Sequence, residues 1–218
     1  MKKIVLATAL FLGIFSSASI FAQRVPDKTL EGYVVGVTQM PGVKKNDTLK
    51  GFITIYNQLA RQQKAVYYKD MANIRTKKVW EPSRAKGYGI DGKFYEAIPY
   101  PASKDNTPTS FAEVVKKGKI TLYRWYSISP KAERKNERKP EDMYDDKDME
   151  KNYLLRKANG EIENVNTLHF SNFKKSMSEF VKEDKELAAR IAKGELGREN
   201  IEDIVEEYNN WAGNKKHK

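Results

Sequence analysis

Tyr88-Gly89-Ile90-Asp91-Gly92-Lys93-Phe94-Tyr95 is the stretch that decides the fold. Asp91-Gly92 suits a two-residue turn, in which both central residues need a positive φ. Aromatic and β-branched residues flank the turn on both sides, as is typical of strands. The stretch therefore predicts a compact β-hairpin.

Further strands are expected on both sides of this hairpin, because short apolar or alternating runs are separated there by turn residues. They are residues 33–38, 48–56, 65–68, 73–79, 119–128, 152–157 and 161–165. The last two form a second hairpin across Asn159-Gly160. Ser110 and Glu113 have the spacing of a capping box, which predicts a short helix that ends at Gly118.

The hydrophobic period changes near the C-terminus. Apolar residues recur at helical spacing from Phe173 to Ile191 and again from Ile201 to Trp211. Both stripes need an apolar surface to cover them, and the sheet is the nearest one. We expect an α+β fold: a mostly antiparallel sheet or partly open barrel of roughly six to nine strands, followed by two C-terminal amphipathic helices.

The N-terminus has the pattern of an export signal, with Lys2-Lys3, an apolar stretch and a small residue at Ala22. The predicted organisation is a signal peptide at 1–22, a flexible leader at 23–31, a β-rich domain at 32–168, a helix pair at 169–212 and a basic tail at 213–218. Residues 131–151 are almost wholly charged and are expected to form a mobile loop. We predict an exported protein, periplasmic or associated with the outer membrane, or extracellular.

Composition excludes several kinds of chemistry and favours some partners. The chain of 218 residues has no cysteine, so disulfides, thiolate metal sites and a cysteine nucleophile are absent. Its formal charge of +11 favours anionic partners, although acids are mixed among the bases. We expect an envelope protein or glycan as partner and allow peripheral contact with the outer membrane. No nucleic acid is expected, since no recognition motif is present.

No catalytic, metal or cofactor residues are assigned from the sequence. His169 is the histidine that a Ser-His-Asp hydrolase would have to use, and no Gly-x-Ser-x-Gly elbow accompanies it. The acids at Asp145–Glu150 lack the spacing and the glycine of a calcium loop. A pair of carboxylates could cleave glycans, but the sequence does not select a pair.

Aromatic residues are the more informative candidates for a binding surface. Tyr123 and Trp125 project from one face of the strand expected at 119–128, and Tyr88 or Tyr95 could join them in a platform for sugar or peptide. The competing interpretation is that the C-terminal helices cover this face and these aromatics are core. The second is favoured, because large aromatics usually supply buried area.

Several motifs resemble an uncharacterised family of exported proteins of Bacteroidota-type bacteria. Asn46–Gly51 is similar to that family's Gly-Asp-Thr-x-x-Gly hairpin, and Phe111–Tyr123 to its junction before a Gly-Lys-Ile-x-Leu-Tyr strand. Glu207–Trp211 resembles its terminal Glu-Tyr-Asn-x-Trp helix. The resemblance implies a fold and an exported location, but no catalytic residues. The charged insert at 131–151 departs from the family pattern.

Three functions follow as hypotheses. The preferred one is a non-enzymatic, envelope-associated binding protein. The first alternative is a carboxylate-dependent hydrolase acting on envelope glycans or peptides, which requires a cleft with two close acids. The second is an adaptor for anionic surfaces, aided by the basic tail. The sequence does not indicate an oligomeric state.

Overall fold

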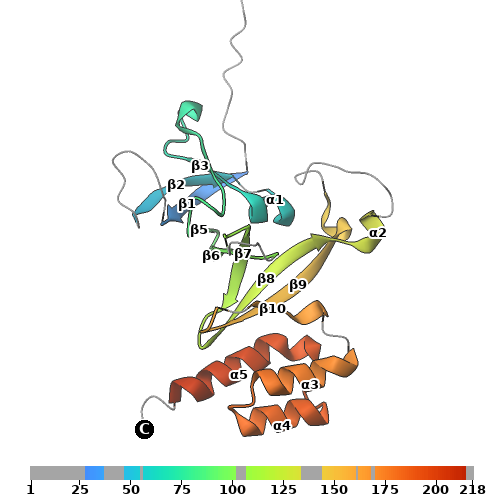
Figure 1. Cartoon of the computed structure of the whole chain (residues 1–218). Helices are drawn as coiled ribbons and strands as arrows, with labels where there is room; N and C mark the ends of the chain where they lie inside the picture. The colour runs from blue at the N-terminus through green and yellow to red at the C-terminus, as the bar shows by residue number, and fades with distance from the viewer. Residues whose placement is uncertain are drawn as a thin grey trace, which may run out of the picture.

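The fold is known from a computed structural model, which describes residues 28–36, 47–54, 56–101, 107–133, 144–160, 162–167 and 170–214. These residues form one open, ten-stranded sheet with helices on it (Figure 1). The strands are β1 (Thr29–Val35), β2 (Thr48–Thr54), β3 (Ala65–Tyr68), β4 (Lys78–Trp80), β5 (Gly87–Ile90), β6 (Lys93–Ile98), β7 (Ser110–Lys116), β8 (Ile120–Ile128), β9 (Met149–Lys157) and β10 (Ile162–Asn164). The helices are α1 (Gln58–Gln63), α2 (Pro130–Glu133), α3 (Phe170–Phe180), α4 (Lys185–Lys193) and α5 (Ile201–Asn214).

The sheet consists of two meanders joined side by side. The spatial order is β10-β9-β8-β7-β6-β5-β1-β2-β3-β4, and all neighbours are antiparallel. The chain therefore returns from β4 across the first meander to place β5 beside β1. The hairpin between β5 and β6 turns at Asp91 and Gly92, whose φ angles are 53° and 68°, which confirms the turn expected there.

One face of the sheet, which we call the inner face, carries the helices. In register across five strands it carries Tyr88, Tyr95, Glu113, Arg124 and Tyr153. The short helix α1 packs on this face against β7 and β8. At the far end of the sheet α3, α4 and α5, which we call the helical lobe, lie below the β8–β9 ribbon (Figure 1).

The helical lobe shares one apolar cluster with the sheet. Ile120, Leu122 and Leu155 of the inner face pack with Phe173 and Ile204, and all five side chains are at most 1% exposed. Alternation along β8 and β9 presents these strand residues to one side, and the helical stripes present their partners. The expected combination of a mostly antiparallel sheet with C-terminal amphipathic helices is therefore shown.

The helices of the lobe differ in number from the expectation. The stripe from Phe173 to Ile191 was expected to be one helix, but it is divided at 181–184 into α3 and α4. Asp184 begins α4 as its N-cap, and its Oδ1 accepts a hydrogen bond from Leu187 N at 3.2 Å. Helical periodicity continues across this break, because both helices bury their stripes in the same cluster. The described residues therefore contain three C-terminal helices, α3, α4 and α5, in place of the expected pair.

The helix expected from Ser110 and Glu113 is wrong, since these residues form β7. Phe111 and Ala112 are fully buried, and β7 pairs with β6 on one side and β8 on the other. A central strand whose two faces are both covered has a continuous run of apolar residues in its sequence. The tertiary pairing overrides the local capping-box spacing.

The edges of the predicted segments also shift. β1 begins at Thr29, inside the segment expected as a leader, and β9 begins at Met149, inside the expected charged loop 131–151. Residues 134–143 of that loop lie outside the described residues. So do the expected signal peptide, His169 and the last four residues of the basic tail.

Candidate functional site: an aromatic groove on the outer face

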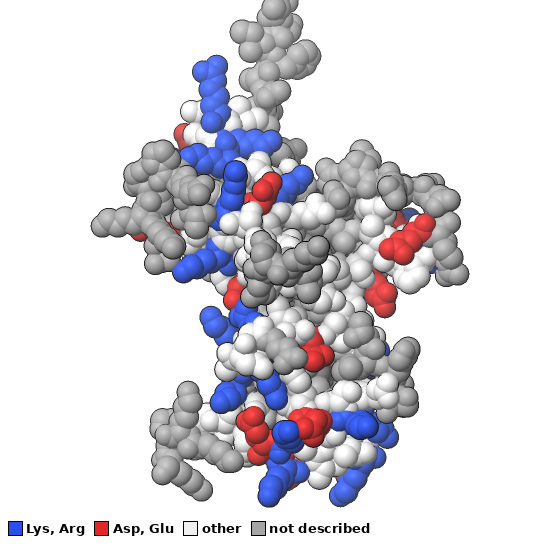
Figure 2. Space-filling model, in the orientation of Figure 1, with Lys and Arg blue, Asp and Glu red and all other residues white. Residues whose placement is uncertain are grey.

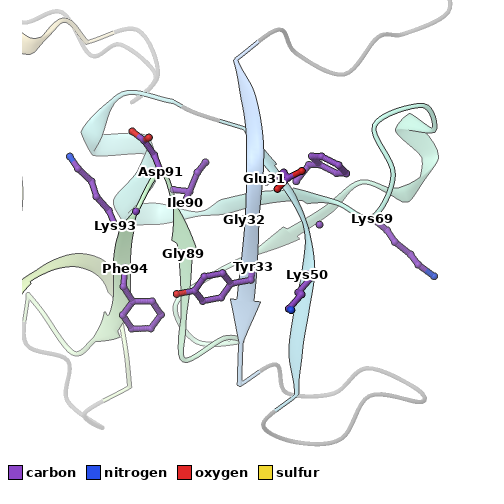
Figure 3. A pocket seen from close by; sticks show the side chains of 13 residues that line it. Glu31, Gly32, Tyr33, Lys50, Lys69, Gly89, Ile90, Asp91, Lys93 and Phe94 are labelled. Atoms are coloured by element: carbon purple, nitrogen blue, oxygen red, sulfur yellow. The ribbon is translucent and has the colours of Figure 1, made fainter.

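A shallow groove of about 630 Å³ lies on the sheet face opposite to α1. We call it the Tyr33–Phe94 groove, and its side chains come from β1, β2 and β6 and from the ends of β3 and β5 (Figure 3). The groove residues that matter below are Glu31, Tyr33, Lys50, Phe52, Lys69 and Phe94. Tyr33 and Phe94 face this outer side because their neighbours Val34 and Tyr95 face the inner one.

Two glycines of β5 make room for the aromatic floor of the groove. A Cβ atom built on Gly89 would overlap the Tyr33 ring, and one built on Gly87 would overlap the Phe94 ring. The two rings lie nearly parallel, with centroids 6.4 Å apart and planes at 16° (Figure 3). The Gly-Tyr-Gly sequence of β5 therefore lets aromatic rings from β1 and β6 lie flat on the strand between them.

The floor is open to solvent and preformed. Tyr33 is 38% exposed although it stacks on a glycine, so its ring is held in place while part of its surface stays available. An aromatic ring with two side-chain torsions loses little conformational entropy when it binds. The arrangement can therefore present a ready stacking surface to a ligand.

Charged side chains of both signs surround this floor. Glu31, Lys50, Lys69 and Asp91 are exposed, and among the described residues none of them has an ion-pair partner. Lys93 differs, because its Nζ lies 3.7 Å from Glu113 Oε1. The groove can thus offer both hydrogen-bond donors and acceptors beside its aromatic surface.

The structure does not bring together the four aromatic residues chosen from the sequence. Tyr88 and Tyr95 stack at 4.8 Å on the inner face, and both are 1% exposed. The Tyr88 hydroxyl donates to Arg61 O at 2.8 Å, and Arg61 Nη1 donates to the Tyr95 hydroxyl at 3.0 Å. Burial raises the pKa of both tyrosines. They hold α1 on the sheet.

Tyr123 and Trp125 do share a face, but it is the outer one. The C-terminal helices cover the opposite side of β8, through Ile120 and Leu122, so the expectation that they cover Tyr123 and Trp125 is wrong. Tyr123 is fully buried, and its hydroxyl lies 3.0 Å from Glu96 Oε2. Burial, and then the nearby Glu96 carboxylate, raises the pKa of Tyr123.

Trp125 is half-buried against a different neighbour. The Tyr100 ring meets it edge-on at 5.0 Å, and its indole Nε1 is buried without a hydrogen-bond partner in the described part of the chain. Tyr123 and Trp125 therefore belong to a small cluster with Ile98, Ala112 and Leu154 on the outer face. This cluster lies over β6, β7, β8 and β9, whereas the groove lies over β1, β2, β5 and β6 of the same face.

A partly buried ionic network joins the sheet to the helical lobe on the inner face. Arg124 Nη1 lies 3.1 Å from Glu113 Oε1, and Nη2 lies 3.2 Å from Glu202 Oε1 on α5. The Tyr153 hydroxyl donates to the same Glu202 oxygen at 2.6 Å. The Tyr153 hydroxyl, and after it Arg124, lower the pKa of Glu202. The network sits between the two main apolar clusters and fixes α5 on β8.

A second groove, of about 560 Å³, is acidic and lies between α4 and α5. Three of its five carboxylates have structural partners. Asp184 caps α4, Glu206 pairs with Lys116, and Glu207 lies 2.5 Å from Arg190 Nη1. Across the residues that the structure describes, no group of histidines and carboxylates has an arrangement suited to a metal ion.

Comparisons with known proteins gave no match: no family model, no curated protein and no solved structure is similar to this chain. No helix among the described segments combines the length and apolar character needed to cross a bilayer.

Proposed function

We propose that the protein is a non-enzymatic, exported binding module of the bacterial cell envelope, and that it holds a glycan in the Tyr33–Phe94 groove. The observation that carries the proposal is the aromatic pair seated on Gly87 and Gly89, in which Tyr33 is exposed and Phe94 is half-buried. The signal-like N-terminal sequence supports export.

A flat aromatic surface suits a sugar ring. The face of an aromatic ring is electronegative, so it attracts the positively polarised C–H groups on one side of a pyranose. Sugar hydroxyls need both donors and acceptors, and the rim of the groove supplies lysine ammonium groups and the carboxylates of Glu31 and Asp91. The groove is open on a sheet face, which favours a binding platform over a reaction chamber that excludes water.

The two alternatives find weaker support. A carboxylate hydrolase would use the acidic groove between α4 and α5, where three of the five carboxylates, Asp184, Glu206 and Glu207, already have structural partners. An adaptor for anionic surfaces would use the basic charge of the chain, whose terminal cluster, residues 215–218, lies outside the described residues.

Co-sedimentation with insoluble envelope polysaccharide, starting with peptidoglycan sacculi, tests the proposal, and an array of soluble glycans extends it. Wild-type protein should bind, and Tyr33→Leu and Phe94→Leu should each reduce binding. Leu30→Ala is the matched control, since Leu30 is also exposed on β1 (42%) but lies outside the groove. Thermal unfolding of each variant checks the fold. Equal binding by wild type and by both folded groove variants would refute the proposal.

A further inference from the structure

We infer that the ligand of the Tyr33–Phe94 groove is an acidic saccharide, one whose sugar rings carry carboxylates, with a ring on the aromatic floor and a carboxylate at Lys50. The inference rests on the proposed function and deepens it. It depends on the register of four neighbouring strands and on the distribution of charge over the molecule.

The register places a lysine at the end of the aromatic floor. Phe94 pairs with Gly89, Gly89 pairs with Tyr33, and Tyr33 pairs with Lys50, so these residues form one row across β6, β5, β1 and β2. Directly paired residues on one face have neighbouring side chains. Three strand spacings give the row a length of about 14 Å, enough for a short oligosaccharide. A ligand lying along it meets two aromatic rings and then an ammonium group.

The second row of the groove adds the groups that select a saccharide. Glu31 pairs with Phe52, and Phe52 pairs with Tyr68. The carboxylate of Glu31 lies beside Tyr33 on the same face, two residues earlier on the strand. A carboxylate accepts hydrogen bonds from sugar hydroxyls, and it repels a ligand that presents only dense negative charge. A lysine in one row and a glutamate in the next thus fit a molecule with both hydroxyls and acid groups.

An extended peptide fits this groove less well. Peptides that bind sheets usually add a strand at an edge, where backbone groups are unpaired. β1 has no free edge, because it pairs with β2 along one side and with β5 along the other. Affinity for a ligand must therefore come from contacts with the sheet face, where the groove offers aromatic rings for stacking and charged side chains.

The charge of the whole molecule also favours an anion at this end. The described residues between 28 and 101 carry 11 lysines and arginines against 6 acids, whereas those of 170–214 carry 7 against 10. Figure 2 shows lysine and arginine side chains over the upper part of the molecule and also over the helical lobe, where acidic side chains lie among them. Such a field raises the local concentration of anionic ligands and speeds their association.

A matched pair of probes tests the inference: tetragalacturonate and its fully methyl-esterified form, which has the same rings without the charge. Isothermal titration of the purified protein should show the acid binding at least about tenfold more tightly than the ester, and raised salt should reduce that preference. Lys50→Gln should remove most of the preference without changing affinity for the ester. Lys77→Gln removes an exposed lysine of the same end of the molecule outside the groove, and it should keep the preference.

The outcomes separate the inference from the proposed function. Equal affinity for acid and ester, lost in both cases with Tyr33→Leu, would overturn the acidic ligand but leave a glycan-binding groove. Binding of poly-glutamate as tight as that of the uronate would also overturn it, because the hydroxyls would then contribute nothing. A preference that Lys77→Gln reduces as much as Lys50→Gln would show diffuse attraction and overturn the assigned site. Absence of any Tyr33-dependent saccharide binding would overturn both.

Discussion

The network around Arg124 gives the sharpest prediction about stability. Replacing Arg124 by methionine keeps much of the side-chain volume and removes the guanidinium that joins Glu113 to Glu202. The Glu113 side chain is only 8% exposed, and its Oε2 already has no hydrogen-bond partner among the described residues. The variant therefore leaves a buried carboxylate whose nearest cation is Lys93, at 3.7 Å.

The size of the effect follows from the burial of the pair. Removing one member of a buried ion pair costs about 3–5 kcal/mol, because the other charge stays buried without compensation. The Arg124 side chain is 21% exposed, so the lower end of the range, about 3 kcal/mol, is expected. For a chain of this length that corresponds to a fall in Tm of roughly 6–12 °C.

A double variant distinguishes this reasoning from simple loss of packing. Arg124→Met combined with Glu113→Leu removes both charges, and apolar replacement of a buried pair is often nearly neutral. The double variant should be more stable than Arg124→Met alone, as measured by urea unfolding followed by tryptophan fluorescence. If the costs of the two single changes simply add, the buried charge is not the cause and the reasoning fails.

Three further predictions concern the helical lobe and the groove. Leu122→Ala, at a fully buried position facing the helical lobe, should cost about 3 kcal/mol in urea unfolding, whereas Val79→Ala, 42% exposed, should change stability by less than about 0.5 kcal/mol; similar values for both would contradict the placement of the core. The folded pKa of Glu202 lies below its ordinary value of 4.5, so its contribution is present above pH 4.5 and lost as the pH falls through the folded pKa. The gap in unfolding free energy between wild type and Glu202→Gln should therefore shrink in acid, and a gap independent of pH would exclude this role. Gly89→Ala should displace the Tyr33 ring and weaken saccharide binding about threefold to tenfold, and adding it to Tyr33→Leu should have no further effect on affinity.

Local chemistry in the sequence predicts those parts of the fold that depend on neighbouring residues. Asp91-Gly92 and Asn159-Gly160 both mark turns between paired strands, β5–β6 and β9–β10. The strand expected at 119–128 is β8, because alternation alone distinguishes its two faces. The two apolar stripes expected near the C-terminus are also confirmed, because helical periodicity indicates which side of a helix is buried.

Non-local pairing is what the sequence does not reveal. Ser110 and Glu113 satisfy a helix-start pattern, yet β7 forms because β6 and β8 provide backbone partners on both sides. Similarly, the segment expected as a strand at 73–79 contains a short 3₁₀ turn at Ile74–Thr76, and its strand begins only at Lys78. Nothing local indicates that β1 lies beside β5, and the groove depends on that pairing.

The groove nevertheless leaves a partial signal in the sequence. A strand with glycine at every second position, Gly87 and Gly89, has one face without side chains, and such a face is unstable unless something covers it. Aromatic residues at alternating positions of neighbouring strands are the usual cover. Tyr33 and Phe94 meet that condition, but only the register shows which glycine each one covers.

The position of the groove follows from how the two faces of the sheet are used. The inner face carries α1 at one end and the helical lobe at the other, with the Arg124 network between them. On the outer face, the cluster of Tyr123 and Trp125 fills the part over β6 to β9. The part over β1, β5 and β6 keeps a partly exposed aromatic floor, because the glycines of β5 leave space that side chains would otherwise fill. A ligand that needs a flat ring surface beside unpaired charges is therefore expected over β5 and β1.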